Sequence, residues 1–269
     1  FGAIEGASLE ANKGAYSYAW MIIFAVIAAI MVLIGLYHIR MLPSNQIPST
    51  TKKTTSEVGR ELVAVIANFF TKKHIFYYIC FIILYRLAEG FIMKIAPLFL
   101  RASREVGGLG LSLKEIGTLN GVFGSAAFVL GSLLAGIYVS KFGLKRTLFT
   151  LCCIFNLPFV AYTFLAVTQP TNVYLIGTCI TMEYFGYGFG FVGLTLFMMQ
   201  QIAPGKHQMS HYAFASGIMN LGVMLPGMVS GYFSDLLGYR DFFIYVLIAT
   251  IPAFLITYFI PFTYDDSKK

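Results

Sequence analysis

Residues 74–100 read HIFYYICFIILYRLAEGFIMKIAPLFL, an apolar run with only three charged side chains, Arg86, Glu89 and Lys94. A helix of about 20 residues crosses a hydrocarbon core of about 30 Å, so this run is long enough to span a membrane. Six similar runs lie on either side of it, at residues 16–37, 115–138, 147–168, 172–200, 211–237 and 241–262. The sequence therefore predicts an all-α integral membrane protein with seven transmembrane helices.

The composition agrees with a chain that is solvated mainly by lipid. Hydrophobic residues make up 58% of the chain and charged residues 12%, and the mean hydropathy is +0.75. We therefore predict that the chain is not an enzyme and that it needs no cofactor or metal. The net charge of +7 does not predict nucleic-acid binding. Lys and Arg gather at the ends of the apolar runs, where membrane lipid is the expected partner.

Positive charge also predicts the orientation of the chain. Most Lys and Arg residues outside the apolar runs lie in one set of alternate connections, which includes residues 38–73 and 139–146 and the end of the chain. Because positive loops are retained on the cytoplasmic side, this set is predicted to be cytoplasmic. The chain is thus expected to start outside, to cross the membrane seven times and to end inside.

The long connection at residues 38–73 has two parts. Residues 43–53 contain two prolines and a run of Ser, Thr and Lys, which is typical of a flexible linker. Thr54 then stands three residues before Glu57, a spacing typical of a helix capping box. Apolar residues follow at helical spacing as far as Phe70. This pattern predicts an amphipathic helix on the inner membrane surface.

The connection after the third run reads GIYVSKFGLKR over residues 136–146. It resembles the signature loop of the major facilitator superfamily, Gly-x-x-x-Asp-Arg/Lys-x-Gly-Arg/Lys-Arg/Lys. Ser140 replaces the acidic residue, and Leu144 displaces the basic pair by one position. A second degraded copy, GYFSDLLGYR, occupies residues 231–240. The resemblance implies a conformational-switch loop formed by Gly136, Ser140, Lys141, Gly143, Lys145 and Arg146.

Three shorter segments are similar to one branch of this superfamily, the anhydromuropeptide permeases (AmpG-like) and the acetyl-coenzyme A transporters. These segments are LYRLAEG at 84–90, EYFGYGFG at 183–190 and HYAF at 211–214. The resemblance implies that the runs are helices 6 to 12 of a twelve-helix fold and that the N-terminal half of the transporter is missing. The implied divisions are the end of that half at 1–37, a cytoplasmic linker at 38–73, a six-helix bundle at 74–262 and a cytoplasmic tail at 263–269.

The implied activity is secondary active transport across a bacterial inner membrane by alternating access. The branch implies a small polar solute, sugar-containing or anionic and similar to a muropeptide, and the expected driving force is the proton gradient. Such a permease would be a multi-pass membrane protein that acts as a symporter. A retinal protein would need a lysine in the last run, and 241–262 has none. A non-transporting seven-helix receptor or sensor remains the alternative.

The charges inside the runs are the candidates for a solute and ion pathway, because an ionisable group at bilayer depth is costly unless it is paired or functional. Arg86 and Glu89 are three residues apart and share a helix face, so they either form a structural ion pair or line the pathway. Arg86 suits an anionic solute because its planar fork binds a carboxylate or phosphate at two points. Lys94 either lines the pathway or reaches the outer surface.

Glu183 has no basic neighbour on its own helix, so it is a candidate for the coupled proton or for a structural hydrogen bond. Tyr187 follows one turn later and is a further pathway candidate. Glycines at 186, 188, 190 and 193 predict a bend or flexible point in this run. Asn120 and Asn156 are expected to form hydrogen bonds between helices.

Overall fold

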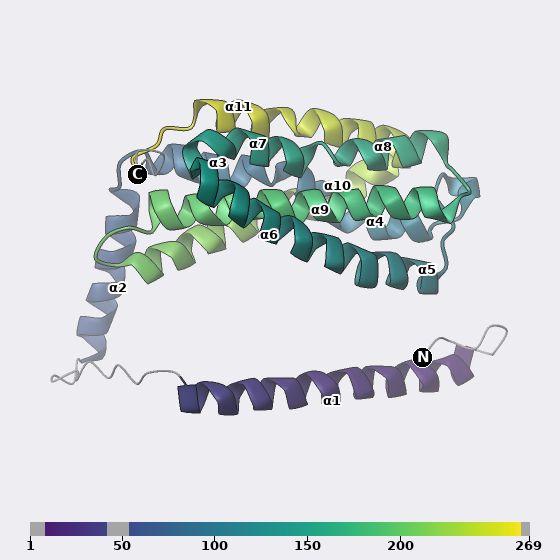
Figure 1. Cartoon of the computed structure of the whole chain (residues 1–269), viewed down its shortest axis with the longest axis horizontal. Coiled ribbons are helices and arrows are strands. Elements are labelled where there is room, and N and C mark those ends of the chain that lie inside the picture. Colours follow the sequence, from purple (N-terminus) through teal and green to yellow (C-terminus); the bar gives the residue numbers. More distant parts are fainter. Residues whose placement is uncertain (1–8, 42–53, 265–269) are drawn as a thin grey trace. The chain divides into compact units, whose positions relative to one another are not determined.

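A computed structural model describes residues 9–41 and 54–264, and every long element within them is a helix (Figure 1). The chain divides into two compact units, Phe1–Glu57 and Val58–Lys269, which are described separately. The first unit contains α1 (Leu9–Met41), and most of its described apolar side chains are exposed. The described residues contain no β-strand, so the predicted all-α class is confirmed.

The second unit begins within α2 (Thr55–Phe70) and holds the remaining helices. The first of these are α3 (Ile75–Tyr85), α4 (Leu87–Arg101), η1 (Arg104–Val106), α5 (Leu113–Thr118), the π-helical segment η2 (Leu119–Gly124) and α6 (Ser125–Phe142). The others are α7 (Leu144–Asn156), α8 (Phe159–Thr168), α9 (Val173–Phe197), the π-helical segment η3 (Met198–Ile202), α10 (Gln208–Ala249) and α11 (Ile251–Phe259).

Five helical stretches among the described residues are long and apolar enough to cross a membrane. They are Ser17–Met41, Ile75–Arg101, Leu113–Phe142, Leu144–Thr168 and Gln208–Phe259. The last has 52 residues and covers two of the predicted runs, which are separated by a non-helical turn at Gly238 with φ 72°. The run at 172–200 forms α9 and η3 and is not one of these five stretches. The seven-helix count stays a prediction.

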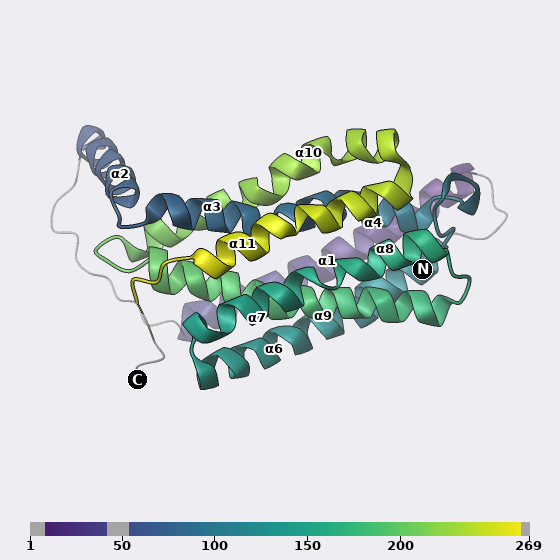
Figure 2. The same cartoon turned by 90° about the horizontal axis from the view of Figure 1, so that it is seen from above.

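The helices of the second unit pack in two groups around α9 and α10. α9 lies beside α6, α7 and α8, whereas α10 lies beside α3, α4 and α8 (Figures 1 and 2). Aromatic side chains fill much of the space between them, and the most completely buried ones include Tyr78, Phe81, Phe99, Phe155, Phe197 and Phe243. The apolar core therefore holds α4 and α9, the two helices that carry Glu89 and Glu183.

The helix predicted in the connection at 38–73 agrees with local geometry. The helix expected after Thr54 is present as α2, and the backbone N–H of Thr54 donates to Glu57 Oε2 at 2.8 Å. The flexible linker at 43–53 lies outside the described residues. In the connection that follows α2, Lys72 Nζ donates to the carbonyl oxygens of Ile202 and Pro204, and partial burial lowers the pKa of Lys72.

The bend or flexible point predicted at the glycines of α9 does not take the form of a break, because α-helix continues from Val173 to Phe197. These glycines instead allow other helices to approach closely. A Cβ atom on Gly188 would lie 2.1 Å from the carbonyl oxygen of Phe128, and one on Gly186 would lie 2.4 Å from that of Ile154. The absence of a side chain is therefore used for packing against α6 and α7 rather than for backbone freedom.

Replacing Gly188 with Ala is expected to destabilise the bundle by about 1–3 kcal/mol, because the new methyl group cannot fit against the backbone of Phe128. Gly136 on α6 provides a matched control, since a Cβ there would meet nothing within 4 Å. Gly136→Ala should be neutral, or stabilising by about 0.5–1 kcal/mol through helix propensity. Thermal unfolding in detergent, followed by the reaction of buried Cys152 with a thiol dye, measures both variants. Equal melting temperatures for the two would contradict the packing role.

Candidate functional site

An ion pair occupies the junction between α3 and α4. Arg86 Nε donates to Glu89 Oε2 at 2.5 Å, and Arg86 Nη2 donates to Glu89 Oε1 at 2.5 Å. The two residues are only 5% and 6% exposed. This is a buried two-point pair, the strong form of a charge-assisted hydrogen bond. The three-residue spacing in the sequence indicated the pair, but not the break in the helix that accompanies it.

The helix break places Arg86 against α9. Arg86 has φ −104° and ψ 6°, which separates α3 from α4 in a run that was predicted as one helix. Its guanidinium carbon lies 5.3 Å from the centre of the Phe191 ring. One residue earlier, the Tyr85 hydroxyl donates to the carbonyl oxygen of Gly190 at 2.9 Å. Both contacts join the junction to the glycine-rich part of α9.

A small cavity of about 180 Å³ lies beside the ion pair. Its apolar wall comes from α4, and its polar lining is formed by Glu89, Asn120, Tyr162, Glu183, Tyr184 and Tyr187. None of the described residues that line it is basic. The structure thus brings three of the predicted pathway residues, Glu89, Glu183 and Tyr187, to one cavity, with Arg86 next to it.

Three polar residues of this lining were not predicted as pathway residues. Tyr162 and Tyr184 were not considered, and Asn120 was expected to bond between helices. Asn120 Oδ1 is instead buried without a hydrogen-bond partner among the described residues. Asn156 donates to the Cys152 carbonyl oxygen of its own helix at 3.0 Å, so its amide donor stays within α7 rather than joining two helices. The sequence could have indicated Asn120, because it is a polar residue within an apolar run.

Lys94 does not line this cavity. It lies on the exposed face of α4, and its side chain runs beside α10, where a Cβ atom on Gly227 would be 3.4 Å from Lys94 Cγ.

No group of three or more His, Cys, Asp or Glu side chains in the described part of the chain is arranged to hold a metal ion.

A hollow of about 600 Å³ lies between the α6–α7 connection and the last part of α9 with η3. Five of the six predicted loop residues line it: Gly136, Ser140, Lys141, Gly143 and Arg146. Gly143 has φ 79° and ψ 147°, a conformation that favours glycine, and it turns the chain between the two helices. Ser140, which replaces the acidic residue of the resembled motif, donates to the Ile137 carbonyl oxygen of its own helix at 2.9 Å.

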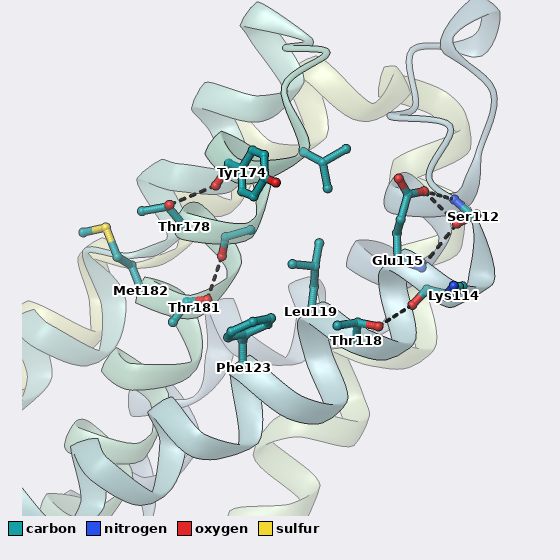
Figure 3. Close-up of a pocket in the computed structure, with 12 residues that line it drawn as sticks. Ser112, Lys114, Glu115, Thr118, Leu119, Phe123, Tyr174, Thr178, Thr181 and Met182 are labelled. Carbon is teal, nitrogen blue, oxygen red and sulfur yellow. Dashed lines mark hydrogen bonds between the residues drawn. The ribbon is translucent and has the colours of Figure 1, made fainter.

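A wider hollow of about 740 Å³ lies between α5–η2 and α9 (Figure 3). Its threonine hydroxyls are already used, because Thr118, Thr178 and Thr181 each donate to the carbonyl four residues earlier. Ser112 and Glu115 satisfy each other in a helix capping box. The hollow therefore offers mainly apolar contacts, and the smaller cavity at Glu183 is the better candidate for a polar site.

The helices are apolar and long enough to span a membrane, and between them lie a buried ion pair and a cavity lined by carboxyl groups. These features define a multi-pass α-helical membrane protein with a polar interior. No protein-family model matches the chain. The chain is similar to the anhydromuropeptide permease of Escherichia coli (strain K12), with 23% identity over 209 residues, 78% of this chain and 41% of that protein.

Two further relatives have related names. The putative transporter AmpG 1 of Rickettsia bellii is 25% identical over 238 residues, 87% of this chain and 56% of that protein. The putative transporter AmpG 2 of Rickettsia prowazekii is 27% identical over 204 residues, 74% of this chain and 47% of that protein. The predicted resemblance to this branch is confirmed, and the chain spans about half the length of these relatives. Permeases and transporters are not enzymes, and the receptor alternative receives no support.

Proposed function

We propose that this chain forms helices 6 to 12 of a major facilitator transporter that carries a muropeptide-like solute across the bacterial inner membrane. The resemblance to named permeases supports the class of solute. The buried Arg86–Glu89 pair beside a cavity that holds Glu183 is the observation that carries the proposal, because buried charge is costly and is retained where a pathway needs it.

In this proposal the chain works with an N-terminal half of the same transporter. Residues 1–37 would end that half, 38–73 would link the two halves in the cytoplasm, 74–262 would form the second bundle and 263–269 would be a cytoplasmic tail. Solute would bind between the halves, which rock around it in alternating access. The loop at 136–146 would then take part in the rocking movement on the cytoplasmic side.

In the proposed pathway, each of a few side chains has a separate role. Arg86 supplies a planar cation that suits an anionic solute, and Glu89 holds it in place. Lys94 offers a second cation on the exposed face of α4. Glu183 would gain and release the coupled proton, and Tyr187 would contact the solute beside it.

Uptake by proteoliposomes that contain the complete transporter tests this proposal. A radiolabelled anhydromuropeptide should accumulate when an inward proton gradient is imposed, and a protonophore should abolish the accumulation. An unrelated dipeptide provides the control for solute specificity. Uptake that equilibrates but ignores the gradient would contradict proton coupling, and the absence of both binding and exchange would contradict the proposed solute.

A further inference from the structure

Asn120 carries an unused acceptor at the cavity that holds Glu183. Its Oδ1 atom is buried and has no hydrogen-bond partner among the described residues. A buried acceptor without a donor loses its hydrogen bonds to water and gains none in return. Such groups are rare in folded proteins and call for a partner or a function. The cavity of about 180 Å³ has room for a carboxyl group to reorient or for water molecules.

The fold holds the segment that bears Asn120 firmly against α9. Asn120 belongs to η2, a π-helical turn of a kind that is frequent at functional sites. The residues at the two ends of η2 both fit against α9. A Cβ atom on Gly177 would lie 2.7 Å from Leu119 Cδ2, and one on Gly124 would lie 2.9 Å from the Tyr184 ring. These two contacts hold η2, and with it Asn120, beside the part of α9 that includes Glu183, and both Asn120 and Glu183 line the same cavity.

The other groups around the cavity leave Glu183 without a counter-charge. Glu89, on α4, is already paired with Arg86. Tyr162 from α8 and Tyr184 and Tyr187 from α9 contribute neutral hydroxyl groups, and no basic side chain is present in the described lining. An ionised carboxylate in such surroundings is costly, whereas a protonated carboxyl needs only an acceptor for its O–H group.

We propose that Asn120 is a positioning residue for Glu183: its Oδ1 atom accepts the hydrogen bond that the protonated carboxyl group of Glu183 donates. The inference deepens the proton-carrying role proposed above and rests on it. Asn120 would stabilise the protonated form and would lose its partner whenever Glu183 releases its proton. The unpaired acceptor would then favour the return of a proton to the same site.

A hydrophobic carbodiimide tests this without any transport measurement, because it labels protonated carboxyl groups in apolar surroundings. The 269-residue chain in lipid vesicles is treated over a pH series, and the label on Glu183 is measured by mass spectrometry of its peptide. Asn120→Ala should shift the midpoint of labelling to lower pH by about 0.5 to 1 unit, since one hydrogen bond to the protonated form is lost. Glu183→Gln should remove the label.

Asn156→Ala is the matched control. Asn156 also has a buried Oδ1 atom without a partner in the described part of the chain, but it lies outside the cavity, so its removal should leave the midpoint unchanged. If Asn120→Ala does not fold, Asn120→Thr and Asn120→Val provide a nearly isosteric pair, of which only Thr supplies an acceptor. An equal midpoint for Thr and Val, or an unchanged midpoint in Asn120→Ala, would overturn the inference. Failure of solute uptake with a shifted midpoint would contradict only the proposed transport.

Discussion

Arg86→Ala is expected to cost about 3–5 kcal/mol of folded-state stability, enough to remove most folded protein from the membrane. The reason is the partner that remains: Glu89 is 6% exposed and would lose the two hydrogen bonds that it now accepts, so its carboxyl group must either stay ionised without a partner or take up a proton, and both are costly. The contact between the Arg86 guanidinium and the Phe191 ring would be lost as well. Folded yield in detergent, measured by size-exclusion chromatography, reports this loss.

The double variant Arg86→Ala with Glu89→Ala should recover much of the folded yield, because no unpaired charge remains buried. Glu89→Ala alone should be as damaging as Arg86→Ala, since it leaves the guanidinium unpaired. A double variant as unstable as either single variant would show that the pair is not the unit that matters. In that case the stacking of Arg86 on Phe191 would be the dominant contribution.

The same variants separate a structural role of Arg86 from a solute-binding role. If Arg86 binds an anionic group of the solute, the folded double variant should not bind solute, and Arg86→Lys should bind it weakly because the planar fork is lost. If the pair only allows α4 to lie in the membrane, the double variant should transport solute. Binding of labelled solute, normalised to folded protein, decides between the two roles.

The sequence predicted the helices well because apolar length is a property of each run alone. It did not predict where a run divides. The run at 74–100 breaks at Arg86, and the run at 147–168 becomes α7 and α8, which are separated at Leu157 and Pro158. The Arg86 break accompanies contacts with α9, which a single run does not reveal.

The glycines also show that tertiary contacts cannot be predicted from a single apolar run. Gly188 and Gly136 both lie inside helices, yet a Cβ atom would clash with Phe128 at Gly188 and meet nothing at Gly136. The difference depends on which backbone lies opposite, and that is decided by tertiary packing. For Asn120 the sequence indicated a polar group in an apolar run, whereas the missing partner and the shared cavity with Glu183 appear only in the folded bundle.

Glu183→Gln in the complete transporter is expected to reduce pH-driven accumulation to the level reached without a gradient, while solute exchange between equal pools continues. Glutamine resembles the protonated carboxyl in size and keeps a hydrogen-bond donor for Asn120. The cavity can therefore still turn from one side to the other with solute. No proton is then obliged to move with the solute, so the gradient no longer drives accumulation.

A structural role for Glu183 predicts another result, because glutamine would preserve both the packing and the donor, and both activities would then continue. Glu115→Gln is the control for the removal of a carboxylate elsewhere, since Glu115 belongs to a capping box outside the cavity, where glutamine also functions. Exchange and pH-driven uptake are measured on the same vesicles. Unaltered accumulation by Glu183→Gln would remove Glu183 from the coupling mechanism, whereas the loss of exchange as well would indicate that glutamine cannot support the turnover that the neutral carboxyl allows.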